Sequence, residues 1–95
     1  MNPSHEVNER VDIVPIFQAN TAERDLCMPW KMRFRGQEIV FTVFGMRHQT
    51  TKGKRMIHVF EMSDGSNDYR IEFDAEHLSW TLASIVEGDS SGRYQ

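Results

Sequence analysis

Hydrophobic and polar residues alternate in three segments of the chain, at residues 30–35, 69–74 and 78–83. Every second residue of these segments is apolar, which is the period of a strand with one buried face. Two further segments, residues 38–48 and 56–62, are rich in β-branched and aromatic residues and also predict strands. The pattern therefore predicts five strands between Trp30 and about Ile85.

Short polar connections separate these predicted strands. Gly36 supplies the first turn, residues 63–67 the third and residues 74–77 the fourth, while we interpret residues 49–54 as a loop and Gly45 as a bulge. Connections this short leave no room for crossover helices, so the strands should pair antiparallel. The predicted fold class is all-β, a small five-stranded antiparallel meander that is strongly bent or closes as an SH3-like small barrel. This likeness is architectural and carries no function.

The ends of the chain give weaker signals. Residues 11–17 form an apolar cluster that Pro15 interrupts, which fits an extra N-terminal strand at an edge. Asn20 with Glu23 fits the start of a short helix. Residues 1–10 and 87–95 are polar and lack periodicity. We expect a flexible N-terminus at 1–10, a single β domain at 11–86 and a disordered C-terminal tail at 87–95.

The second and third predicted strands are apolar on both faces. On the second strand, one face carries Ile39, Phe41 and Val43 and the other carries Val40 and Phe44. On the third strand, Ile57 and Val59 lie opposite Met56, Phe60 and Met62. The second face needs a cover, either residues 11–17 of the same chain or another chain. The candidate partner surface consists of Val40, Phe44, Met56 and Phe60.

Charge is distributed unevenly along the sequence. Residues 31–58 contain seven Lys and Arg but one acidic residue, whereas the chain as a whole has a net charge of −3. We call these seven residues the basic strip: Lys31, Arg33, Arg35, Arg47, Lys52, Lys54 and Arg55. A basic strip predicts binding to nucleic-acid phosphates. The other interpretation is that these side chains protect a sheet edge and pair with acidic strands, and the acidic balance of the protein favours it.

Residues with catalytic or metal-binding chemistry form no known motif. The four histidines lack metal-ligand spacing, Cys27 is the only cysteine, and no phosphate-binding loop or nucleophile elbow is present. We therefore predict no enzyme activity, no metal and no cofactor. An enzyme that uses His48 and His77 is a third hypothesis, and it requires the two side chains to converge on one pocket.

The leading prediction is a small non-enzymatic binding module whose partner is another protein or a second copy of the chain. Nucleic-acid binding through the basic strip is the alternative. The sequence has no apolar run long enough for a membrane span and no secretory signal, and it has a single cysteine. These features predict a cytoplasmic protein without a membrane partner.

Overall fold

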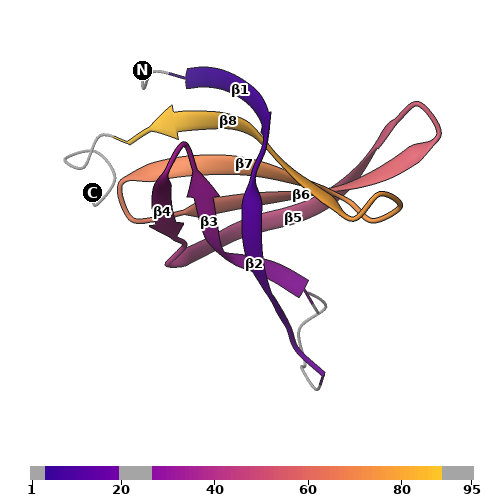
Figure 1. Ribbon diagram of the computed structural model, residues 1–95, viewed down its shortest axis with the longest axis horizontal. Helices are drawn as coiled ribbons and strands as arrows, with labels where there is room; N and C mark the ends of the chain where they lie inside the picture. Colours follow the sequence, from indigo (N-terminus) through magenta and orange to yellow (C-terminus); the bar gives the residue numbers. More distant parts are fainter. Residues whose placement is uncertain (1–3, 20–26, 89–95) are drawn as a thin grey trace.

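The computed structural model describes residues 4–19 and 27–88, which form eight β-strands and no helix (Figure 1). All pairs are antiparallel, in a five-stranded sheet of order β1-β8-β7-β6-β5 and a three-stranded sheet of order β2-β3-β4. The strands are β1 (Ser4–Arg10), β2 (Asp12–Phe17), β3 (Cys27–Phe34), β4 (Gln37–Val40), β5 (Val43–Lys52), β6 (Arg55–Ser63), β7 (Asn67–Asp74) and β8 (Ser79–Glu87). The all-β, antiparallel prediction is confirmed.

The two sheets are joined at corners where the chain passes from one sheet to the other. Val11 connects β1 to β2, and its amide donates to the carbonyl of Trp80 at 3.1 Å. At the second corner, the Phe41 amide donates to Trp30 in the small sheet and the Thr42 amide donates to Ser63 in the large sheet, each at 2.9 Å. The second predicted strand is therefore two strands in different sheets. No closed barrel is found among the described residues, so SH3-like closure stays a prediction.

The core lies between the two sheets, where β2, β3 and β4 cross the five-stranded sheet (Figure 1). Its buried members are Met32, Phe41, Phe60, Met62, Tyr69, Ile71 and Leu82. Val11 and Ile13 pack against this cluster, whereas Phe17 is 72% exposed. Residues 11–17 thus cover part of the large sheet, as one of the two sequence interpretations expected.

The opposite face of β6 is covered by charged side chains. Ile57 and Val59 lie on this face and are 4% and 0% exposed. On this face, Lys52 lies in the cross-strand row before that of Ile57, and Glu72 lies in the row after it. The 2.7 Å ion pair between Lys52 and Glu72 therefore passes over Ile57. The aliphatic stem of the lysine can therefore shield the isoleucine while its ammonium group stays at the surface.

Three sequence predictions need correction. Ser4–Arg10, expected to lie outside the fold, form β1, which pairs with β8 and packs Val7 against the core. Residues 49–52 continue β5 to a tight turn at Gly53 instead of forming a loop. Phe41 and Phe44 both contact the core, because the alternation breaks at the corner between β4 and β5. The predicted helix start at residues 20–23 and most of the predicted tail, 89–95, lie outside the described residues.

Candidate functional site

The basic strip divides between the two sheets. Lys31, Arg33 and Arg35 belong to β3 and the turn after it, in the small sheet. The remaining four, Arg47, Lys52, Lys54 and Arg55, belong to β5, β6 and the hairpin turn between them. These two groups lie on different sheets, so a single nucleic-acid backbone would have to follow both.

At least four residues of the basic strip have acidic partners. Ion pairs join Lys31 to Glu38 at 3.9 Å, Lys52 to Glu72 at 2.7 Å, Arg55 to Asp74 at 2.6 Å, and Arg35 to Glu9. Exposed pairs such as Lys31–Glu38 and Arg35–Glu9 contribute little stability, whereas Asp74 is the buried member of its pair. All four pairs lower the positive potential that a phosphate would meet.

Asp74 organises the turn between β7 and β8. Its side chain is 8% exposed and accepts hydrogen bonds from the Arg55 guanidinium at 2.6 Å and the His77 ring at 3.0 Å, and from the backbone amides of Glu76 and His77. Burial alone would raise the pKa of the Asp74 carboxyl, but the hydrogen bonds from His77 and Glu76 outweigh it and lower that pKa. The cluster therefore serves to hold a turn.

The two histidines of the enzyme hypothesis are separate in the fold. His48 pairs with Val59 in the middle of β5, and it takes no part in the hydrogen bonds that surround His77. The part of the chain that the structure describes holds no group of three or more His, Cys, Asp or Glu that could bind a metal ion. It also contains no helix able to span a membrane.

The four residues of the predicted apolar surface do not form one exposed patch. Phe60 is 2% exposed inside the core, and Phe44 is half-buried against it. Met56 is exposed on β6. Val40 is exposed on the small sheet, in one row with Lys31 and Val14. These three residues form one cross-strand row, and the charged Lys31 in its middle separates the two valines.

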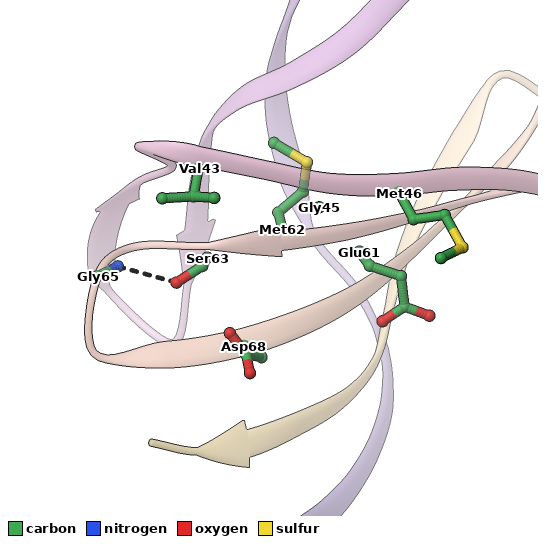
Figure 2. Close-up of a pocket in the computed structure, with 8 residues that line it drawn as sticks. All are labelled: Val43, Gly45, Met46, Glu61, Met62, Ser63, Gly65 and Asp68. Atoms are coloured by element: carbon green, nitrogen blue, oxygen red, sulfur yellow. Dashed lines mark hydrogen bonds between the residues drawn. The ribbon is translucent and has the colours of Figure 1, made fainter. Parts of the chain in front are cut away.

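A hollow of about 560 Å³ lies where β5 begins (Figure 2). We name it the β5 hollow; its lining residues are Val43, Gly45 and Met46 of β5, Glu61, Met62 and Ser63 of β6, and Gly65 and Asp68 beyond them. Val43 is 52% exposed and Met46 is 59% exposed. These are large apolar side chains left open to solvent around a concave site.

A bulge at Gly45 brings Val43 and Met46 to the same face. Val43 pairs with Ser63 and Met46 with Glu61, and the register shifts between Phe44 and Met46. A Cβ atom at Gly45 would lie 2.7 Å from the carbonyl oxygen of Glu61, so the close approach requires glycine. Strict alternation would place positions 43 and 46 on opposite faces. The alternation along the sequence therefore does not reveal this pair, although Gly45 was the available signal.

Hydrogen bonds fix the turn that borders the β5 hollow. The Gly65 amide donates to Ser63 Oγ at 3.0 Å (Figure 2), and the Ser66 and Asn67 amides donate to Asp64 Oδ1 at 2.8 Å. The Tyr69 hydroxyl donates to Asp64 Oδ2 at 2.8 Å. Burial, together with the neighbouring carboxylate, raises the pKa of Tyr69 to about 12. This wall of the hollow is therefore held in place before any ligand arrives.

The hollow also lies on an unpaired sheet edge. β5 is the last strand of its sheet, and β6 is its only ladder partner among the described residues. An edge strand presents backbone N–H and C=O groups that can pair with another chain. Carboxylates of Glu61 and Asp68 line the hollow, and Arg70 approaches Glu61 to 3.5 Å.

Comparison with protein-family models, curated proteins and solved structures gives no match to this chain. Its function is therefore argued from the geometry of its own residues.

Proposed function

We propose that the domain is a non-enzymatic protein-binding module that takes an extended segment of a partner protein along the edge of β5. The β5 hollow carries this proposal, because it combines exposed apolar side chains with an unpaired strand edge. In strand addition, backbone hydrogen bonds supply affinity and pockets for alternate side chains supply specificity. Both elements occur at the start of β5.

The chemistry of the lining selects the kind of segment. Val43 and Met46 offer an apolar surface to one side chain of the added strand. Glu61, which Arg70 approaches to 3.5 Å, and Asp68 place carboxylates beside it, and the oxygens of a carboxylate can accept a further hydrogen bond from a basic side chain. The preferred segment is extended, with an apolar residue flanked by Lys or Arg.

Selection from a displayed library of random heptapeptides tests this proposal. Wild-type protein should enrich peptides with an apolar residue next to a basic one. Met46→Lys should weaken binding of the selected peptides by about tenfold or more, which corresponds to about 1.4 kcal/mol. Lysine at this position removes apolar lining and repels the basic side chain.

Thr50→Lys is the matched control, since Thr50 is also exposed on β5 but does not line the hollow. It should leave peptide binding within about twofold, a change smaller than about 0.5 kcal/mol. Failure to enrich any peptide, or equal loss in both variants, would contradict the proposal. A concentration-dependent dimer that Met46→Lys abolishes would mean that a second copy, and not another protein, occupies the edge.

A further inference from the structure

A second cavity lies on the other face of β5 and β6, between the two sheets. Its volume is about 310 Å³, at the lower end of the range of small-molecule sites, about 300–1,000 Å³. Phe17 and Cys27 line it from the small sheet, and Arg47, His58 and Phe73 line it from the large sheet. We name it the inter-sheet cavity.

Aromatic side chains form the inner wall of this cavity. Phe60 and Phe73 both pack against Trp80, with ring centroids 5.6 Å and 4.5 Å away, and the Phe73 pair is stacked. Phe17, 72% exposed, also lines the cavity. Packing against Trp80 holds the rings of Phe60 and Phe73 in place. These two rings therefore give a flat apolar surface that loses little conformational entropy when a ligand binds.

Two polar side chains, those of Arg47 and His58, also line the cavity. Arg47 and His58 come from neighbouring strands, and Arg47 Nη1 lies 3.5 Å from His58 Nδ1. A guanidinium has five N–H donors in a planar fork, so it can bind a carboxylate while it keeps other contacts. Apolar surroundings strengthen such a charge interaction relative to water.

Cys27 adds an apolar surface to the cavity. Burial raises the pKa of its thiol, and the nearby charge of Arg47 offsets this only in part. The thiol is therefore protonated at neutral pH and is a weak nucleophile. The chemistry of the cavity is that of binding, without a covalent step.

We propose that the inter-sheet cavity binds a small carboxylate-bearing apolar molecule. Its carboxylate lies on the guanidinium of Arg47 and its aromatic or hydrocarbon body lies against Phe60 and Phe73. This site is separate from the β5 hollow, since the two lie on opposite faces of β5 and β6 and share none of their lining residues. A small ligand and a partner segment can therefore bind at the same time.

Calorimetric titration of the full chain with 3-phenylpropionate tests the proposal, with 3-phenylpropanamide as the uncharged analogue. The acid should bind with a dissociation constant near or below about 1 mM. The amide should bind at least about tenfold more weakly, because it cannot form the charge-assisted pair with Arg47. This comparison uses wild-type protein, so it does not depend on the folding of a variant.

Variants then locate the interaction. Arg47→Gln should bind the acid and the amide equally, whereas Arg33→Gln, at an exposed position of the small sheet, should keep the preference for the acid. Equal binding of acid and amide to the wild type would overturn the proposal. So would an absence of saturable binding at about 10 mM, or an unchanged preference in Arg47→Gln.

Discussion

At the scale of single residues, Gly45 determines the shape of the β5 hollow. Its backbone lies against the Glu61 carbonyl, and the resulting bulge turns Met46 to the face that Val43 occupies. A side chain at this position would meet a backbone atom, which cannot rotate away. Glycine is thus required here by contact, and its φ angle is not in the left-handed region.

Gly45→Ala should lower the free energy of unfolding by roughly 1–3 kcal/mol, the usual cost of forcing an extra methyl group into a packed site. Urea denaturation measures this change. Thr50→Ala on the same strand is the control, and its effect should be smaller because Thr50 is exposed. An alanine variant as stable as the wild type would show that β5 can move away from β6 at no cost.

The ionisation of Asp64 makes the stability of the fold depend on pH. Burial raises the pKa of its carboxyl, but hydrogen bonds from Asn67, Ser66 and Tyr69 together outweigh burial and lower it below the ordinary value of 3.8. A carboxyl with a lowered pKa in the folded state stabilises the fold above the pKa of the unfolded chain. That stability is lost as the pH falls through the folded pKa.

Asp64→Asn should therefore lower wild-type stability at pH 7 by about 1 kcal/mol, a modest value because the carboxylate is partly solvated. The difference between the two proteins should shrink as the pH falls below about 4. Thermal unfolding at a series of pH values measures it. A difference that stays constant from neutral to acid pH would contradict the role given to the ionised carboxylate.

At the scale of elements, strands with one polar face were predictable and bent or polar strands were not. Alternation located the centres of β3, β7 and β8, because each buries one face. β1 was missed because its sequence is almost entirely polar, with Val7 as its one side chain packed on the core. The break between β4 and β5 was missed because a continuous β-branched and aromatic run gives no signal for a change of sheet.

Removal of residues 1–10 tests the assignment of β1. The truncated chain should lose at least about 2 kcal/mol of stability, because β8 loses one of its two ladder partners and Val7 leaves the core. Removal of residues 1–3 is the control, since these residues precede β1. Equal urea midpoints for the three chains would support the original expectation of a flexible N-terminus.

At the scale of the whole molecule, the candidate site depends on contacts between segments that the sequence does not place together. The basic strip is contiguous in sequence but divides between two sheets, and at least four of its members meet carboxylates from other strands. The β5 hollow and the inter-sheet cavity both combine residues from several strands. Such combinations follow from topology and register, which composition and periodicity do not determine.

This distribution of charge predicts weak or absent binding to nucleic acid. A labelled single-stranded oligonucleotide should show no mobility shift at low salt, where phosphate contacts are strongest. A shift that disappears with added salt and weakens in the combined variant Arg33→Ala, Lys54→Ala would revive the alternative function. Met46→Lys would not be expected to abolish such a shift.

Amide hydrogen exchange of the full chain, measured with and without the best heptapeptide selected by the wild type, tests the proposed function most directly. We expect the peptide to slow exchange by about tenfold or more at amides near the start of β5, beside Val43 and Met46, as new ladder hydrogen bonds form there. Unchanged exchange in β5, with protection instead at β1 or in the small sheet, would contradict the proposed function.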